Sequence, residues 1–96
     1  MQFNSGTTLV TADSSVGVSG KPFRLFSYSM LSGATAGVVQ LRNGTSTSGV
    51  IQKQIDGVIS KSVDGEFVNG LLFPLGLFVD VDANVASISI NGSSEA

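Results

Sequence analysis

The sequence contains no cysteine and no histidine, and the absence of both excludes whole classes of chemistry. Disulfide bonds need cysteine, and the usual zinc sites need cysteine or histidine. The commonest general base and the Ser–His and Cys–His couples of nucleophilic catalysis need histidine. The composition therefore predicts that the chain is not an enzyme and has no catalytic residues, no cofactor and no metal.

Charged side chains are also scarce, because they make up 12% of the sequence, with a net charge of −2, whereas about 25% is typical of a soluble domain. A surface so poor in charge is weakly protected against association. Two explanations stay open: another chain covers part of the surface, or Ser, Thr, Asn and Gly keep it polar. The few basic residues are scattered, so we expect no nucleic-acid partner.

Long hydrophobic runs are missing as well. The longest, at residues 71–79, is interrupted by Pro74 and Gly76, and it is far shorter than the roughly 20 residues of a spanning helix. The opening residues have neither the basic region nor the apolar stretch of a secretory signal. We therefore expect no membrane segment and no secretory signal.

Short runs of Val, Ile, Phe, Ser and Thr fill the sequence, and no long window shows a helical period. Asn-Gly and Asp-Gly pairs favour the positive φ angles of the tight turns that join paired strands. Such pairs begin at Asn43, Asp56, Asp64, Asn69 and Asn91. The pattern predicts an all-β fold of at least six strands: a single compact antiparallel β-sandwich of the jelly-roll or Ig-like type. We assign residues 1–96 to this one domain, from which residues 1–20 could extend.

Alternation within the predicted strands assigns their faces, because successive side chains of a strand point in opposite directions. In the strand near residues 23–31, Phe26, Tyr28 and Met30 are expected on one face and Leu25 on the other. Residues 58–63 are expected to form a further strand. The side chains expected to be buried are those of Leu25, Val39, Leu41, Ile51, Ile88 and Ile90.

The apolar run at residues 71–79 cannot be one central strand, because Pro74 has no N–H to donate to a sheet. We expect a strand that ends at Phe73, a corner at residues 74–76 and a second strand from Leu77. Leu77 and Val79 are expected inside the sandwich itself. The run holds more apolar surface than one small core needs, so part of it is predicted to contact another subunit. The predicted contact residues are Leu72, Leu75 and Phe78.

One short motif suggests a metal site and then departs from it. Asp80, Asp82 and Asn84 alternate as the first ligands of an EF-hand loop do. Val85 stands where that loop needs glycine, and Asn91 stands where it needs a bidentate glutamate. The motif therefore predicts a solvated strand face that ends in a turn, and no metal is expected.

Two stretches, "FSYSMLSGATAGVVQLRNGTSTSGVIQKQIDG" and "EFVNGLLFPLGLFVDVDANVASISING", resemble small β-sandwich virion proteins of tailed bacteriophages. The resemblance covers roughly residues 23–92 and rests on structural motifs, so no active-site residues follow from it. It implies a non-enzymatic protein at the capsid surface that decorates or cements the head. The implied partners are the major capsid protein or other virion subunits, together with further copies of this chain in a homo-oligomer.

The alternative from another class is a ligand-binding or host-recognition module of a tail appendage. Clustered aromatic side chains on an open face would favour it, since carbohydrate sites often stack sugars on Trp or Tyr. The sequence has no Trp, and Tyr28 is its one tyrosine. Tyr28 and Phe26 are expected in the core or on a sheet face rather than in such a platform.

Overall fold

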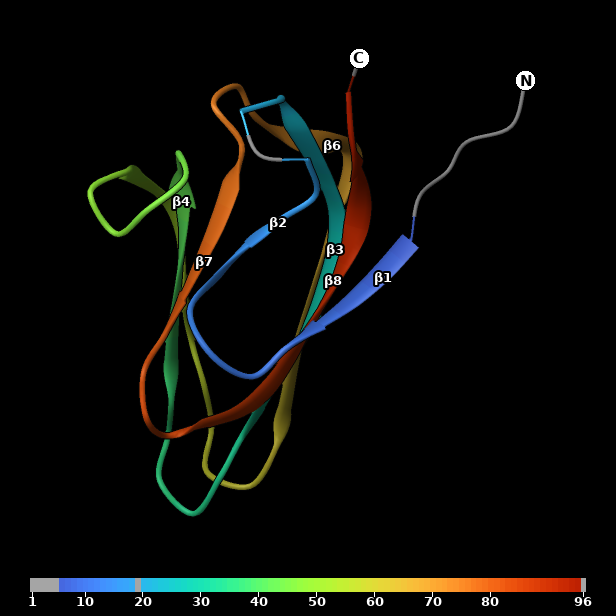
Figure 1. The fold of residues 1–96 in the computed structure, drawn as a ribbon. Helices are drawn as coiled ribbons and strands as arrows, with labels where there is room; N and C mark the ends of the chain where they lie inside the picture. The colour runs from blue at the N-terminus through green and yellow to red at the C-terminus, as the bar shows by residue number, and fades with distance from the viewer. Residues whose placement is uncertain (1–5, 19, 96) are drawn as a thin grey trace.

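The computed structural model describes residues 6–18 and 20–95, and every regular element in these residues is a strand (Figure 1). The strands are β1 (Gly6–Val10), β2 (Ser14–Val16), β3 (Phe23–Ser32), β4 (Val38–Asn43), β5 (Val50–Asp56), β6 (Ser62–Phe73), β7 (Leu77–Val81) and β8 (Val85–Ser94). The all-β prediction is confirmed, and the two described ranges contain no helix that could cross a membrane. The corner expected at Pro74 separates β6 from β7.

The strands form two antiparallel sheets of four, in the orders β1-β8-β3-β6 and β2-β7-β4-β5 (Figure 1). The pairs β1–β8, β2–β7, β3–β6 and β4–β5 are nested along the chain. The chain thus resembles one long hairpin rolled into two layers; the pair β3–β8 completes one layer and the pair β4–β7 completes the other. Eight strands wound in this way form a double-sheet jelly roll, the first of the two expected sandwich types.

The core lies between the two sheets. Leu25, Val39, Leu41, Ile88 and Ile90 are fully buried in it, as the alternation predicts. Leu77 and Val79 are buried there too, so this part of the apolar run serves the domain's own core, as expected.

The prediction that Ile51 is buried is wrong, because β5 contains a bulge. The pairing of β4 with β5 shifts after Leu41, so that Ile51 lies opposite Arg42 and is 42% exposed. The extra residue is Gln52, which has no paired residue on β4. One extra residue reverses the faces of a strand, and Ile55, beyond the bulge, is buried instead.

A second shift, at Phe26 on β3, corrects the expected faces of that strand. Both neighbours of β3 change register between Leu25 and Ser27. Leu25 and Met30 are therefore both buried, although strict alternation places them on opposite faces. On β6 the same shift spans residues 67–70, because Leu71 pairs with Leu25 while residue 66 pairs with Ser27.

Three of the expected turn pairs lie inside strands and form no hairpin turn. They are Asp64-Gly65 and Asn69-Gly70 on β6 and Asn91-Gly92 on β8. Gly70 has a φ of 77°, which suits the wide bulge of β6. At Gly92 a Cβ would collide with the carbonyl oxygen of Arg24, so glycine permits close approach of β8 and β3.

The bulge in β5 gives a direct test of the assigned faces. We expect Leu41→Ala and Ile88→Ala each to lower the free energy of unfolding by roughly 2–5 kcal/mol, since each leaves a cavity. Ile51→Ala should cost less than about 1 kcal/mol, because Ile51 is already 42% exposed and its truncation leaves no enclosed cavity. Urea unfolding of the three variants measures this, and a loss at Ile51 equal to that at Leu41 would contradict the bulge.

Candidate functional site

Phe78, one of the predicted contact residues, lies on the outer face of the β2-β7-β4-β5 sheet. It is opposite Ser15 on β2 and opposite Arg42 on β4, and Arg42 is opposite Ile51 on β5. These four residues form one row across the whole sheet. Phe78 is half-buried in the row, and Ile51 adds an apolar neighbour that alternation alone assigns to the core.

A network of hydrogen bonds holds the centre of this face rigid. The Arg42 guanidinium donates through Nε to Asp80 at 3.0 Å, through Nη1 to the Gly49 carbonyl at 2.9 Å and through Nη2 to Gln40 at 3.0 Å. The Gln40 amide donates in turn to Gln54 at 3.2 Å. In the Arg42–Asp80 ion pair the two charges neutralise each other. The acidic end of β7 is therefore paired, and Phe78 stands beside a neutral pair.

Leu75 is held outward at the end of the same sheet. Its side chain is 62% exposed, and its backbone N–H donates to the Asn43 side chain at 2.7 Å. The next residue, Gly76, accepts a bond from the Gly44 N–H at 2.9 Å and has a φ of 106°, a conformation that favours glycine. Leu75 thus projects from a turn fixed at both sides. We call Ile51, Leu75 and Phe78 together the Phe78 surface.

Leu72, the remaining predicted contact residue, belongs to the other sheet. It lies opposite Arg24 on β3 and is half-buried. Its carbonyl accepts a hydrogen bond from the Gln52 side chain at 3.0 Å, which ties β6 to the neighbouring edge strand β5. The three predicted residues are therefore not on one face: Leu75 and Phe78 share the Phe78 surface, and Leu72 lies around the side of the sandwich.

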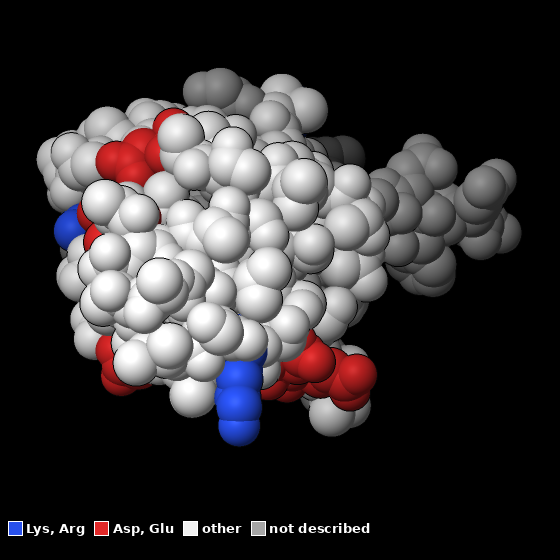
Figure 2. Space-filling model, turned by 90° about the horizontal axis from the view of Figure 1, so that it is seen from below, with Lys and Arg blue, Asp and Glu red and all other residues white. Residues whose placement is uncertain are grey.

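The opposite end of the sandwich carries exposed apolar side chains where the strand expected at residues 58–63 is wrong, because only residues 62 and 63 belong to a strand, β6. Residues 58–61 form a turn, in which Val58 and Ile59 are exposed, and Leu31 is exposed at the nearby end of β3. Ser60 has a φ of 56° and donates its N–H to the Gly33 carbonyl at 3.0 Å. Seen from this end, the charged side chains lie toward the margin and the centre is uncharged (Figure 2).

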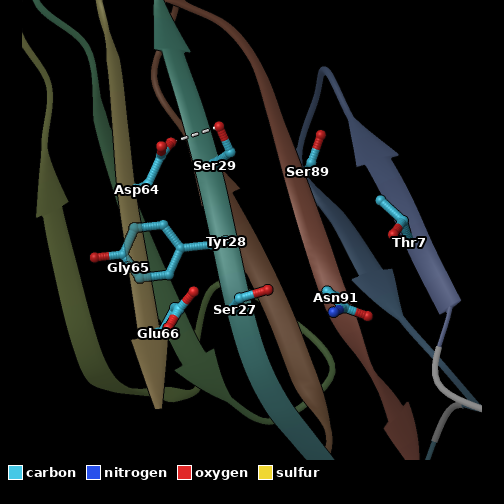
Figure 3. A pocket seen from close by; sticks show the side chains of 9 residues that line it. All are labelled: Thr7, Ser27, Tyr28, Ser29, Asp64, Gly65, Glu66, Ser89 and Asn91. Atoms are coloured by element: carbon cyan, nitrogen blue, oxygen red, sulfur yellow. Dashed lines mark hydrogen bonds between the residues drawn. The ribbon is translucent and has the colours of Figure 1, made fainter. Parts of the chain in front are cut away.

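The outer face of the β1-β8-β3-β6 sheet is polar and slightly hollowed (Figure 3). The depression has a volume of about 300 Å³. Two rows of paired residues cross it: Asp64, Ser29 and Ser89 form one, and Glu66, Ser27, Asn91 and Thr7 form the other. The Ser29 hydroxyl donates to Asp64 at 2.6 Å. Short serine side chains on β3 and β8 make the floor, so the depression offers hydroxyl, amide and carboxylate groups to a ligand.

Tyr28 also borders this depression and packs against the core. Its ring lies 6.2 Å from that of Phe67, and it fills the space that a side chain at Gly65 would need. This explains the glycine at position 65, which the sequence assigns to a turn. Tyr28 is consequently part of the sheet and its core, as expected, and forms no open aromatic platform.

The EF-hand-like residues serve the sheet and a turn. Asp80 is bonded to Arg42, and the Asp82 carboxylate accepts bonds from the N–H groups of Val38 and Asn84, each at 2.9 Å. Within residues 6–18 and 20–95 no three His, Cys, Asp or Glu side chains gather as a metal site requires. One oxygen of Asp80 and both oxygens of Asp82 thus accept hydrogen bonds from the protein's own donors.

One ion pair near Leu72 responds to pH. Arg24 donates through Nε to Glu95 at 2.7 Å and through Nη1 to the Asn69 carbonyl at 3.1 Å. The hydrogen bond from Arg24 lowers the pKa of the Glu95 carboxyl below its ordinary value, and the same bond raises the pKa of Arg24. The pair therefore fastens the end of β8 to β3 when Glu95 is ionised.

We expect Glu95→Gln to lower the free energy of unfolding at neutral pH and to have no effect in acid. The folded pKa of Glu95 lies below the unfolded one, so the contribution is complete above the unfolded pKa of about 4.3. It is lost as the pH falls through the folded pKa. Urea unfolding of parent and variant between neutral and acid pH measures it. In an Arg24→Gln background Glu95→Gln should change nothing at any pH, and a persisting difference would show another cause.

Comparisons with known proteins assign no role to these surfaces. A jelly roll alone does not specify a function, because unrelated functions share the fold. No protein-family model, curated protein or solved structure matches this chain.

Proposed function

We propose that this chain is a non-enzymatic structural protein of a bacteriophage virion, specifically a decoration or cement protein at the capsid surface. The observation that carries the proposal is the Phe78 surface: apolar side chains of Phe78 and Ile51 on an outer sheet face and of Leu75 on a hydrogen-bonded turn, on a domain with few charges. Its partners would be the major capsid protein or other virion subunits. The resemblance of the sequence to small phage β-sandwich proteins supports the same reading.

The Phe78 surface suits permanent contact better than solvent exposure. Leu75 is 62% exposed and Ile51 is 42% exposed, and an apolar side chain of this size contributes roughly 1.5–3 kcal/mol when it passes from full exposure to full burial. The turn that carries Leu75 and the network around Arg42 are already fixed in the free domain. Binding therefore orders few groups, and more of the burial energy remains for attachment.

Such a protein can stabilise a capsid without any chemical reaction, by contact between its rigid domain and neighbouring subunits. A rigid domain that buries apolar side chains against two neighbouring subunits makes their separation cost the energy of both contacts. Val58 and Ile59 are a second set of exposed apolar side chains, and in Figure 1 their turn between β5 and β6 lies at the other end of the sandwich from the turn between β6 and β7. One domain can thus contact two neighbours at once without any change of its own conformation.

We expect Phe78→Asp to weaken attachment to particles while the domain still folds. The change places a charge in the centre of the Phe78 surface, where covering it would cost desolvation. Co-sedimentation with particles that lack this protein measures attachment, and a melting curve reports folding. Val68→Asp is the matched control, because Val68 is 98% exposed and lies on β6, away from the Phe78 surface.

The two possible failures of this prediction have different meanings. If Phe78→Asp unfolds the domain, Ile51→Asp tests the same surface with a side chain outside the core. If both variants fold and attach as the Val68→Asp control does, the Phe78 surface is not the contact.

A second candidate function is a ligand-binding or host-recognition module, and the polar depression beside Tyr28 favours it. Its hydroxyl, amide and carboxylate groups suit a ligand rich in hydroxyl groups, such as a saccharide. Tyr28 is the one tyrosine, and tryptophan is absent. The intrinsic fluorescence of Tyr28 therefore reports directly on this depression.

Titration with a panel of neutral oligosaccharides should change the Tyr28 fluorescence in a saturable way if the depression binds them. Glu66→Ala, at the depression, should then weaken binding at least tenfold, since it removes a charged hydrogen-bond acceptor. Asp56→Ala, an exposed carboxylate of the other sheet, should bind as the parent does. Flat titrations with the whole panel would leave the structural role as the remaining proposal.

A further inference from the structure

Each sheet has two edge strands, and three of the four edges carry features that oppose pairing with another chain. Strand β2 has only three residues. Strand β5 has the bulge at Gln52 and the charge of Lys53, and β6 has the bulge at residues 67–70 and the carboxylates of Asp64 and Glu66. Short length, bulges and charges are the usual protection of sheet edges.

Strand β1 has none of these features. Its sequence GTTLV contains no charge and no proline, and its pairing with β8 runs without a shift. Every second residue of an edge strand directs its N–H and C=O away from the sheet. In Figure 1, β1 lies at the side of the sheet, with no other described strand beyond it. The outward side chain of Leu9 is 65% exposed.

We propose that β1 is the site at which a second copy of this chain binds, by antiparallel pairing of β1 with β1 across a twofold axis. Four strands from each copy would then form one continuous sheet of eight. This contact between copies goes beyond the proposed attachment to a virion and does not depend on it, because the Phe78 surface lies on the other sheet.

Among the antiparallel registers of β1 with itself, the one centred on Thr8 pairs all five residues of the strand. When Thr8 lies opposite Thr8 of the second copy, Leu9 lies opposite Thr7 and Val10 lies opposite Gly6. Thr7 and Leu9 point outward, as their partners Asn91 and Ser89 do, so outward residues meet outward ones. A shift by one residue would set outward against inward side chains.

This register also covers the exposed apolar group and creates no charge repulsion. The two Leu9 side chains become diagonal neighbours across the axis, within reach of each other. Thr8 opposite Thr8 is a favourable cross-strand pair, and Val10 meets only a glycine. A foreign peptide would need this same pattern, whereas a second copy has it by identity, as a twofold contact requires.

Cross-linking tests the register directly, because the chain has no cysteine of its own. Opposite residues of an antiparallel pair have Cα atoms about 4.5–5.5 Å apart, within the range of about 4.4–6.8 Å that a disulfide spans. Thr8→Cys should therefore give a disulfide-linked dimer on mild oxidation. Val68→Cys, fully exposed on β6, is the matched control. A Thr8→Cys yield no higher than that of the control would overturn the proposal.

Sedimentation tests the contact without a cross-link. The parent chain should show a concentration-dependent dimer, and Leu9→Lys should show only the monomer, because the two lysines would be diagonal neighbours across the axis and repel each other. Val68→Lys should dimerise as the parent does. If Leu9→Lys does not fold, Thr7→Lys, also exposed and outward, takes its place. A parent that is monomeric at every concentration, or a folded Leu9→Lys that still dimerises, would show that β1 is not the contact.

The same measurements separate this contact from the proposed virion role. Phe78→Asp should leave the Thr8→Cys cross-link unchanged, and Leu9→Lys should leave the Phe78 surface intact. Loss of particle attachment in Phe78→Asp with a normal cross-link would support both proposals. A cross-link that fails while attachment persists would remove the β1 contact alone.

Discussion

Burial of two apolar sheet faces against each other is the constraint on which the rest of the molecule depends. The chain has no disulfide to limit its unfolded state, so the layer between the sheets must hold the fold. Strands β3 and β8 pair along most of their lengths in the centre of one sheet, and β4 and β7 do so in the other. The Phe78 surface, the polar depression and the edge of β1 all lie on the outside of the two sheets that this buried layer holds together.

The outer faces of the two sheets have different characters because different residues occupy the same strand positions. Behind Leu25 and Ile90 the outward residues of β3 and β8 are mainly serines, which leave the face polar and hollowed. Behind Leu41 and Val79 the outward residues include Arg42 and Asp80, which neutralise each other, and Phe78, which makes the face partly apolar. The two sheets therefore keep their outer faces low in net charge in different ways. One sheet carries hydroxyl groups, and on the other the Arg42 and Asp80 charges pair with each other.

Alternation predicts the buried residues wherever a strand is regular, and this is why Leu41 and Ile88 could be placed from the sequence. It fails at Ile51 and Met30 because a bulge changes the phase and leaves no mark in the residue types. Phe26, the extra residue of β3, is apolar like Leu25 before it, and Gln52 is polar like Gln54.

Glycine positions also mislead the prediction of turns. The sequence does not show whether a glycine provides a positive φ angle, a close approach of two strands or room for a neighbouring side chain. Gly44 follows β4 where a turn is expected, but Gly92 serves a close approach of two strands and Gly65 leaves room for Tyr28. Leu75 and Phe78 could be singled out because Pro74 fixes the corner between β6 and β7. The exposed pair Val58 and Ile59 could not, because an apolar pair after a turn signal also suits a strand.

The nested pairing of the strands has a consequence for the order in which the chain can fold. The β4–β5 pair joins neighbours in sequence, whereas β1 and β8 lie at opposite ends of the chain and yet pair directly. Contacts between distant segments form slowly, because the loop between them must close first. Strand β8 also lies between β1 and β3, so β1 has no partner in its sheet until β8 arrives. During synthesis, β1 therefore waits unpaired while almost the entire domain is made, and its uncharged edge stays open to other nascent chains for longer than any other strand.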